Sequence, residues 1–248
     1  MDPKLFSASG HTRTAFERDH ALIAPDGHII TALPAWGGAQ GVVLISPAMG
    51  AHLAQTLISL ELGPDISFSP SRGIEAVMYV LEGEVLADGT ALRSGSYVFL
   101  PAGETMRFSI QSSARLLVFE KRFTPGADSP ARFIGHESEI EGVPFLGDPD
   151  ATLQVLLPPT PDFDMAVNIF SYQPGATLPF VETHVMEHGL LMLDGMGIYR
   201  LNNCWYPVAA GDCIWMAPFC PQWFAATGKV PARYLYYKDI NRDAMEEL

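Results

Sequence analysis

The sequence predicts an all-β protein built from two copies of one β-barrel unit. Short apolar runs are separated throughout by turn residues, because 22 of the 248 residues are glycine and 20 are proline. Such punctuated runs are typical of a β-sandwich or barrel. No stretch keeps the 3.6-residue apolar period of a long helix, although a helical turn is expected within residues 137–141. The third observation is an ordered internal repeat.

Residues 1–40 mix short apolar segments with turn signals at residues 25–27 and 37–38, and they are expected to form an N-terminal arm with short strands. Residues 41–125 are expected to form the first barrel. Its strand-like runs lie at residues 42–45, 56–60 and 76–81, and its breaks fall at Pro47, Gly63-Pro64, Ser69-Pro70-Ser71 and Asp88-Gly89.

The repeat relates two stretches that lie about 112 to 117 residues apart. Four ordered segments match: 80–85 with 192–197, the turns 88–89 with 202–203, 92–101 with 208–218, and the closing strands 117–121 with 235–238, each of which carries a lysine. Self-similarity at a fixed spacing indicates a duplicated unit. A second barrel is therefore expected over residues 151–248. Residues 126–150, rich in proline, glycine and acidic residues, are expected to link the two barrels.

Composition excludes some classes of partner. The net charge of −13 argues against nucleic acid and anionic membranes, which require clustered lysine and arginine. The three cysteines, an odd number, do not form a disulfide framework and suit a reducing compartment. Neither a signal peptide nor an apolar run of membrane-spanning length is evident. A soluble, cytoplasmic protein is expected.

Residues 181–189 are the stretch richest in chemistry. Glu182, His184 and His188 lie within seven residues of a chain that contains seven histidines. Because alternate residues of a strand point to one face, Glu182 and His184 should project together, while the path to His188 stays open. Imidazole and carboxylate groups form a ligand set for first-row metals. The alternatives are histidines on the surface, or histidines that satisfy buried hydrogen bonds.

The second unit resembles the two cupin motifs, which implies a bicupin, with two jelly-roll barrels in one chain. The matching positions are Gly175, Glu182-Thr183-His184 in the His-x-His place, His188 in the Glu place, Gly195, and then Gly211 through Pro218 to Gln222, which replaces a histidine.

The departures from the cupin pattern bear on the metal. The implied ligands are Glu182, His184, His188 and Gln222, and two oxygen donors beside two imidazoles favour Mn²⁺ over other first-row metals. In the first unit no histidine lies at the matching positions, and Thr105 or Met106 falls where Gln222 would lie. The first barrel is therefore expected to be metal-free.

Longer strings resemble the (S)-ureidoglycine aminohydrolase family over residues 8–243. They are residues 22–27, 73–75, 182–184, 187–189 and 237–242. The resemblance implies an enzyme of purine breakdown that releases ammonia from (S)-ureidoglycine to give (S)-ureidoglycolate. It also implies that Mn²⁺ is bound by the four residues named above, and that Tyr199, Tyr234 and Lys238 face the substrate.

The last strand supports part of this reading. Tyr234, Tyr236 and Lys238 alternate and should share one face, from which Lys238 could bind a carboxylate. Glu182, Tyr234 and Lys238 are the candidates for moving the proton during amine departure. The alternatives are that Lys238 is a solvated strand-end lysine and that Tyr199 fills the barrel.

Two other functions remain open from the sequence. One is a cupin dioxygenase or isomerase, against which Gln222 counts because oxygen-activating sites usually have more imidazole ligands. The other is a non-catalytic cupin that binds a small molecule. For the aminohydrolase a homo-oligomer with a small-molecule substrate is expected. Other residues of the second unit are expected to be structural: Cys220 as a buried thiol, Glu187 behind the ligands or on the surface, and Trp205, Trp215 and Trp223 in the core or an interface.

Overall fold

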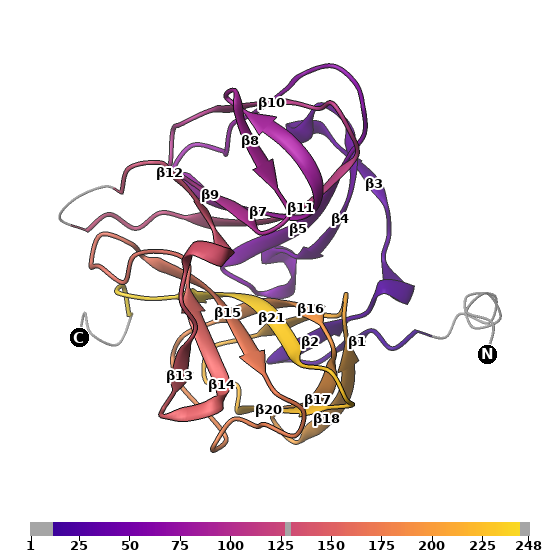
Figure 1. The fold of residues 1–248 in the computed structure, drawn as a ribbon, viewed down its shortest axis with the longest axis vertical. Coiled ribbons are helices and arrows are strands. Elements are labelled where there is room, and N and C mark those ends of the chain that lie inside the picture. The colour runs from indigo at the N-terminus through magenta and orange to yellow at the C-terminus, as the bar shows by residue number, and fades with distance from the viewer. Residues whose placement is uncertain (1–11, 127–129, 244–248) are drawn as a thin grey trace. The chain divides into compact units, whose positions relative to one another are not determined.

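The computed structural model describes residues 12–126 and 130–243 of the chain and confirms the all-β class (Figure 1). It divides into two compact units. Of the described residues, unit 1 contains 12–28, Gly142–Gln154 and Asn168–Asp239, and unit 2 contains the described part of Ile29–Glu141, Val155–Val167 and 240–243. Among the described residues the helical elements are four 3-10 turns: η1 (Pro25–Gly27), η2 (Pro34–Trp36), η3 (Pro47–Met49) and η4 (Glu137–Glu139). The last confirms the helical turn expected near residue 137.

Unit 1 is formed by an eight-stranded and a three-stranded antiparallel sheet. The first has the order β1 (Ala15–Phe16), β2 (His20–Ile23), β19 (Cys213–Met216), β16 (His188–Asp194), β21 (Ala232–Asp239), β15 (Met165–Tyr172), β14 (Asp148–Val155) and β13 (Val143–Phe145). The second has the order β18 (Cys204–Ala209), β17 (Met196–Leu201) and β20 (Gln222–Thr227). Inward-facing side chains of both sheets form one core, which includes Leu190, Tyr199 and Phe224.

Unit 2 is formed by a ten-stranded sheet. Its main path is β12 (Phe133–His136), β9 (Ser96–Leu100), β7 (Ile74–Ala87), β11 (Ala114–Arg122), β5 (Leu53–Leu60), β4 (Ala39–Ile45) and β3 (Thr31–Leu33). Off this path, β10 (Met106–Ser109) pairs with β6 (Ile66–Phe68) and β7, and β8 (Thr90–Arg93) pairs with β7. The core includes Trp36, stacked on Phe68 at 4.2 Å between ring centroids.

Two glycines mark the same place in the two repeats. Gly83 and Gly195 have φ angles of 77° and 72°, a backbone conformation that residues other than glycine rarely adopt. A Cβ atom at Gly83 would collide with the carbonyl oxygen of Ser113, and one at Gly195 with that of Pro231. The repeated glycine is therefore required both by backbone conformation and by the close approach of a neighbouring strand.

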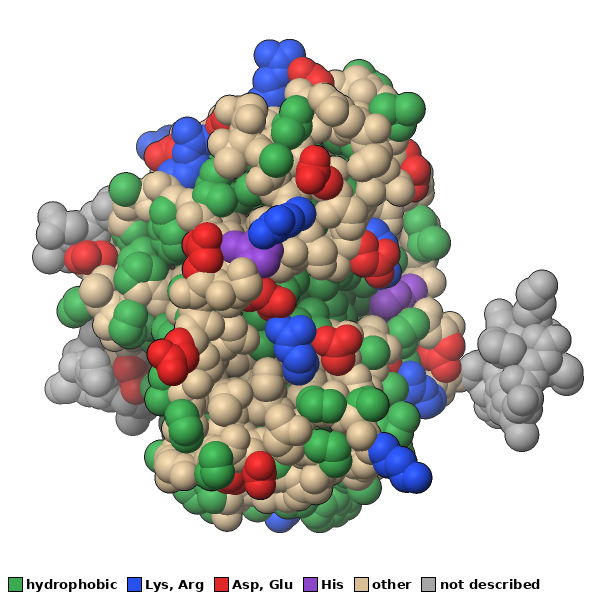
Figure 2. Space-filling model, viewed as in Figure 1, with side chains coloured by type: hydrophobic (Ala, Val, Ile, Leu, Met, Phe, Trp, Pro, Cys, Tyr) green, Lys and Arg blue, Asp and Glu red, His purple; other side chains and the backbone are tan. Residues whose placement is uncertain are grey.

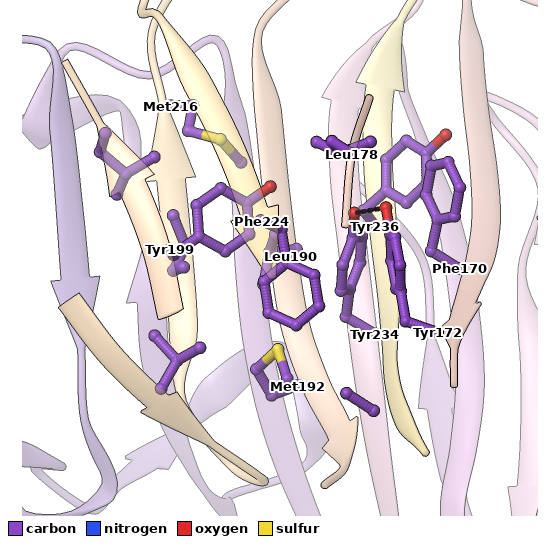
Figure 3. Packing of buried hydrophobic residues seen from close by; sticks show 14 of the residues in the cluster. Phe170, Tyr172, Leu178, Leu190, Met192, Tyr199, Met216, Phe224, Tyr234 and Tyr236 are labelled. Atoms are coloured by element: carbon purple, nitrogen blue, oxygen red, sulfur yellow. Dashed lines mark hydrogen bonds between the residues drawn. The ribbon is translucent and has the colours of Figure 1, made fainter. Parts of the chain in front are cut away.

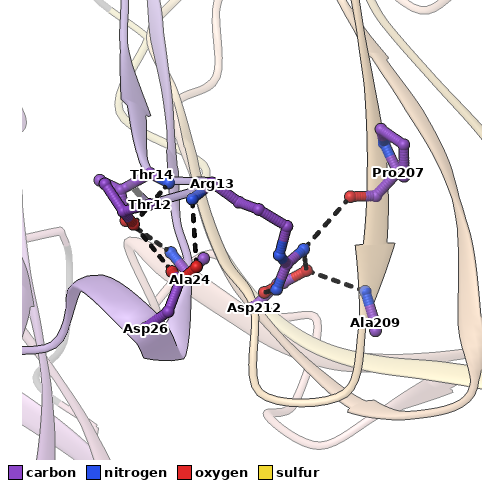
Figure 4. Close-up of polar contacts among 8 residues, drawn as sticks. All are labelled: Thr12, Arg13, Thr14, Ala24, Asp26, Pro207, Ala209 and Asp212. Carbon is purple, nitrogen blue, oxygen red and sulfur yellow. Dashed lines mark hydrogen bonds and ion pairs between the residues drawn. The ribbon is translucent and has the colours of Figure 1, made fainter. Parts of the chain in front are cut away.

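The first two strands, β1 and β2, belong to the unit that contains the C-terminal strands. Strand β2 pairs with β19, with Leu22 opposite Ile214. Arg13 donates to both carboxylate oxygens of Asp212, at 2.8 and 2.7 Å, and Asp212 also accepts from the N–H of Ala209 (Figure 4). The Asp212 side chain has no exposed surface, so this pair ties the N-terminal arm to the β18–β19 turn.

The observed units differ from the expected ranges at two places. Residues 1–40 were expected as one arm, but the division falls after His28, and β3 pairs with β4 of unit 2. Residues 126–150 were expected as a linker, but they contain β12, β13 and the start of β14. The composition of this stretch suggested a linker, yet its apolar residues Phe133, Val143 and Phe145 lie on strands that extend the two sheets.

The surface carries both signs of charge. On the face shown in Figure 2, acidic and basic side chains are interspersed among hydrophobic ones. Over the described ranges, no helix has the length and apolar character needed to cross a membrane.

Candidate functional site

A cavity of about 110 Å³ lies inside the barrel of unit 1. It is well below the roughly 300–1,000 Å³ of pockets for drug-sized ligands, so it suits a small molecule. The structure brings all seven residues singled out from the sequence to its wall: Glu182, His184, His188, Tyr199, Gln222, Tyr234 and Lys238. Phe145, Phe170, Leu190, Met216 and Tyr236 complete the lining.

Backbone pairing places these side chains. His188 is the first residue of β16 and lies opposite Met216 on one side and Lys238 on the other. Glu182 and Gln222 form an isolated antiparallel bridge. The N–H of Phe219 donates to the carbonyl oxygen of His184 at 2.7 Å, from a turn in which Phe219 has a φ of 63°. The 182–188 segment is thus held by the start of β20, by the turn at Phe219, and by strands β19 and β21.

The strand expected over the start of this segment is not formed. Glu182 makes a single bridge, the chain bends at Val185, and regular pairing starts only at His188. Alternation along a strand therefore does not explain why Glu182 and His184 lie together. The bend places His184 and His188 with ring centroids 4.8 Å apart.

Gln222 lies between the two imidazoles. Its Nε2 is 3.0 Å from His184 Nε2, and its amide lies 3.0 to 3.2 Å from His188 Nδ1. The other ring nitrogen of His188, Nε2, is buried and has no hydrogen-bond partner among the described residues. A buried imidazole nitrogen without a hydrogen-bond partner can serve as a ligand atom for a metal ion, so the residues present fit a bound metal.

The electrostatics also suit a metal. Burial lowers the pKa of His188 well below its usual value, and the neighbouring His184 and Lys238 lower it further. Burial and then Lys238 lower the pKa of His184. Both rings are therefore neutral near pH 7, the state in which an imidazole can ligate. Burial raises the pKa of Glu182, against the effect of Lys238.

Lys238 presents a cation to the cavity. Its ammonium makes no hydrogen bond to any residue that the structure describes, and it lies in the field of Glu182 and Asp239. Burial lowers its pKa, and these two carboxylates oppose that shift. A half-buried ammonium without a hydrogen-bond partner is suited to bind an anionic group of a ligand. The alternative of a fully solvated strand-end lysine does not fit its place on the cavity wall.

Glu187 is a buried residue that is held by hydrogen bonds within the protein. It is fully buried, and its carboxylate accepts the indole N–H of Trp215 at 2.7 Å. Its own N–H donates to Asp239. The surface role considered for Glu187 is therefore wrong, whereas the buried positions of Trp215 and Cys220 are as expected.

A second cluster was not found from the sequence. Ligand atoms of Asp19, His20 and Cys220 all lie within 4.8 Å of one another, so this cluster could hold a metal ion. Over the described part of the chain it is the one trio of His, Cys, Asp or Glu residues that meets this distance, which Glu182, His184 and His188 do not meet together. The sequence does not indicate this cluster because Cys220 lies far along the chain from the adjacent Asp19 and His20.

The hydrogen bonds of that cluster are already complete. His20 Nδ1 lies 2.8 Å from Asp19, and Nε2 lies 2.9 Å from the hydroxyl of Tyr206. Both imidazole nitrogens thus have protein partners, in contrast to the orphaned Nε2 of His188. A metal at His20 would have to displace one of these bonds, so the pair of imidazoles in the cavity is the better candidate.

The repeat shows what unit 2 has at the same positions. Ala76 lies opposite Glu120 where His188 lies opposite Lys238. Phe68 lies opposite Met106 where Glu182 bridges Gln222. The counterparts of three ligand candidates are therefore apolar.

The register also settles two details of the repeat. Met106, rather than Thr105, is the counterpart of Gln222. The match of Lys121 with Lys238 is wrong by one residue, because Lys121 lies opposite Glu75 on the other face of its strand, and Glu120 takes the place of Lys238.

Fold and site together define a bicupin with a small cavity suited to a metal and an anionic ligand. A family model described as a cupin domain matches residues 168–237. The chain is 40% identical to (S)-ureidoglycine aminohydrolase of Arabidopsis thaliana over 95% of this chain and 80% of that protein. It is 34% identical to (S)-ureidoglycine aminohydrolase of Escherichia coli (strain K12) over 90% and 89%. It belongs to the (S)-ureidoglycine aminohydrolase family.

A solved structure has the same fold as this chain. The crystal structure of the protein Ylba from E. coli superposes with a TM-score of 0.83 and 32% sequence identity, covering 94% of this chain and 96% of that one. The likeness extends over both units, so the two-barrel expectation for the fold is confirmed.

Proposed function

We propose that this chain is an (S)-ureidoglycine aminohydrolase, a hydrolase in which water replaces the amine of (S)-ureidoglycine, releasing ammonia and (S)-ureidoglycolate. The observation that carries the proposal is the pairing, within one small cavity, of neutral imidazoles at His184 and His188 with the unbonded ammonium of Lys238. The substrate has a carboxylate for the cation and heteroatoms for a metal. Membership of the family supports the same reaction.

The metal that we propose is Mn²⁺, bound by Glu182, His184, His188 and Gln222. The orphaned nitrogen of His188 and the mixed oxygen and nitrogen donor set support this choice. When bound, a divalent ion supplies Lewis-acid polarisation of substrate oxygen or nitrogen atoms. Binding would also require at least one of the three side chains Glu182, His184 and His188 to move, since their ligand atoms do not all lie within 4.8 Å of one another.

The remaining residues bind and orient the substrate. The Nζ of Lys238 pairs with the carboxylate of the substrate. Tyr199 and Tyr234 present buried hydroxyls at the cavity wall, and burial raises the pKa of each, so both remain neutral hydrogen-bonding groups near pH 7. For Tyr199, contact with the cavity and filling of the barrel are thus compatible roles.

The proton transfers need an acid and a base. The high pKa of the Tyr234 hydroxyl makes it unsuited as a base. We assign removal of a proton from the attacking water to the carboxylate oxygen of Glu182 that would not hold the metal. Protonation of the departing amine is assigned to Lys238, a cation in the same cavity.

Unit 2 is proposed to be metal-free, a view supported by the apolar counterparts Phe68, Ala76 and Met106. We also propose a homo-oligomer in the cytoplasm. None of the three cysteines, all of them described, is in a disulfide, which supports the reducing compartment.

The test is ammonia release from freshly generated (S)-ureidoglycine by metal-stripped protein, with and without added Mn²⁺. We expect release that depends on the added metal. If fully metallated protein releases no ammonia, the proposal fails. Consumption of O₂ or rearrangement of a substrate would then indicate a dioxygenase or isomerase, and ligand binding without turnover would indicate a binding cupin.

A further inference from the structure

Tyr172 lies behind the cavity wall and contacts Tyr234, one of the residues proposed to bind the substrate. It is fully buried near the end of β15 and does not line the cavity. Its hydroxyl lies 3.1 Å from the hydroxyl of Tyr234, which does line the cavity. Figure 3 shows the two rings next to each other, joined at their oxygen atoms.

Packing alone does not explain this hydroxyl. The Tyr172 ring is stacked on Phe170 at 5.1 Å between centroids and meets Phe224 edge-on at 4.9 Å. Phenylalanine would make the same ring contacts. A buried hydroxyl costs free energy unless it is hydrogen-bonded, and here the partner is the hydroxyl of Tyr234.

The bond restricts Tyr234 in a way that matters for a ligand. A phenol hydroxyl has one proton and two lone pairs, and it rotates about its C–O bond when nothing holds it. With one direction of the Tyr234 oxygen taken by Tyr172, its remaining donor or acceptor direction is set. Tyr234 is buried and lines the cavity, where its hydroxyl also interacts with that of Tyr199, so a ligand there meets a hydroxyl of fixed orientation.

The same strand makes a second contact of this kind. Asn168, also buried, donates from Nδ2 to the hydroxyl of Tyr236 at 3.0 Å. Tyr236 lines the cavity and meets the ring of His188 edge-on at 5.6 Å. Two polar side chains of β15 thus hold the hydroxyls of two neighbouring cavity tyrosines.

We propose that Tyr172 is a positioning residue that orients the Tyr234 hydroxyl for the substrate, an inference that rests on the proposed aminohydrolase function. Tyr172 acts through Tyr234 and touches neither substrate nor metal. Its hydroxyl therefore matters only while Tyr234 keeps its own. Substrate capture, which belongs to Lys238 and the metal, is unaffected.

The experiment is a double-mutant cycle on the Mn²⁺-loaded full-length protein with Tyr172→Phe, Tyr234→Phe and both together. We measure kcat and KM for ammonia release, bound metal and thermal unfolding. Loss of one hydrogen bond predicts a fall in kcat of about three- to tenfold for Tyr172→Phe, with little change in KM. In the Tyr234→Phe background, Tyr172→Phe should cause no further fall. The control is Tyr237→Phe, which removes a fully buried hydroxyl from the opposite face of β21.

Each outcome is decisive. Unchanged kcat in Tyr172→Phe, or an equal fall in both backgrounds, overturns the inference while leaving the enzyme assignment intact. A purely structural role would appear as coupling in thermal unfolding without coupling in kcat, and it would also overturn the inference. If the metallated wild-type protein releases no ammonia, the proposed function fails first, and the role of Tyr172 fails with it.

Discussion

The main chains of Glu182 and Gln222 exchange two hydrogen bonds. The N–H of Glu182 donates to the carbonyl oxygen of Gln222 at 2.8 Å, and the N–H of Gln222 donates to the carbonyl oxygen of Glu182 at 2.9 Å. Two proposed ligands from distant parts of the sequence are thus joined through backbone rather than side-chain atoms. Substitution of either side chain should therefore remove a ligand without separating the segments.

The first prediction concerns metal removal. Glu182→Ala and His188→Ala should each lose bound Mn²⁺ and ammonia release. The loss of activity should exceed about 100-fold, because substitution of residues outside the ligand set alone costs up to that much. Elemental analysis and steady-state assays measure both quantities, and circular dichroism should show the fold retained. Full activity in either variant would refute the site.

Two matched variants separate the candidate metal clusters. His20→Ala alters the Asp19–His20–Cys220 cluster, and His136→Ala alters a histidine of unit 2 that bonds to Ser94 and Ser138. Both should keep Mn²⁺ at the wild-type level. Loss of Mn²⁺ from the His20 variant with retention in the His188 variant would move the metal to the second cluster.

The second prediction concerns Lys238. Lys238→Met should lower kcat/KM by at least about 10- to 100-fold, the effect of losing one charged hydrogen bond, and loss of the proton donor adds to this, while the metal is retained. Because burial lowers the pKa of Lys238, its positive charge is present below that lowered pKa and lost as the pH rises through it. Wild-type kcat/KM should therefore decline on the alkaline side, below the usual lysine range. A pH–rate profile measures this.

Lys238→Arg provides the control for charge. Guanidinium stays protonated throughout the accessible range, so any residual activity of this variant should lack the alkaline decline. An unchanged decline would show that another group causes it.

The third prediction concerns the arm. Arg13→Ala removes the partner of the fully buried Asp212 carboxylate and should lower the free energy of unfolding by about 1–3 kcal/mol, less than for a fully buried pair because the Arg13 side chain is 47% exposed. Arg107→Ala is the control, because both members of its pair with Asp65 are exposed, and it should cost at most about 1 kcal/mol. Urea unfolding measures both. Equal effects would contradict the anchoring role.

The fourth prediction concerns a buried carboxyl of unit 2. Glu75 is buried, and its pKa is raised first by burial and then by Asp164, which is paired with Lys121, while Lys121 and Arg242 oppose the shift. Because the pKa of Glu75 is higher in the folded than in the unfolded state, the folded protein loses stability as the pH rises from the usual carboxyl range through the raised pKa. The loss can reach about 1.4 kcal/mol per pH unit.

Glu75→Gln should flatten this alkaline loss, since the amide stays neutral. Unfolding free energies measured at several pH values between roughly 6 and 9 provide the test. Glu61→Gln, at an exposed position, should leave the wild-type slope. A wild-type slope in the Glu75 variant would assign the pH dependence to other groups.

The local chemistry of the chain predicted much of the fold. Glycine and proline mark the ends of short strands. Each copy of the duplicated unit also needs a glycine at the position of Gly83 and Gly195, so this glycine makes the repeat visible in the sequence. The residues that line the cavity could be predicted from the sequence because imidazole, carboxylate and amide groups at this spacing form a ligand set for a metal. The family resemblance indicated the same residues.

The sequence by itself determined the all-β class, the duplication, the family and the list of candidate site residues, because these depend on residue types and their spacing. Only the tertiary structure decided which strands pair and which face each side chain takes. It placed β2 beside β19, made strands of residues expected to be a linker, and put Lys121 on the opposite face from Lys238's counterpart, Glu120. The physical reason is that pairing and register arise from hydrogen bonds and burial between distant segments, and a shift of one residue reverses the face of every side chain.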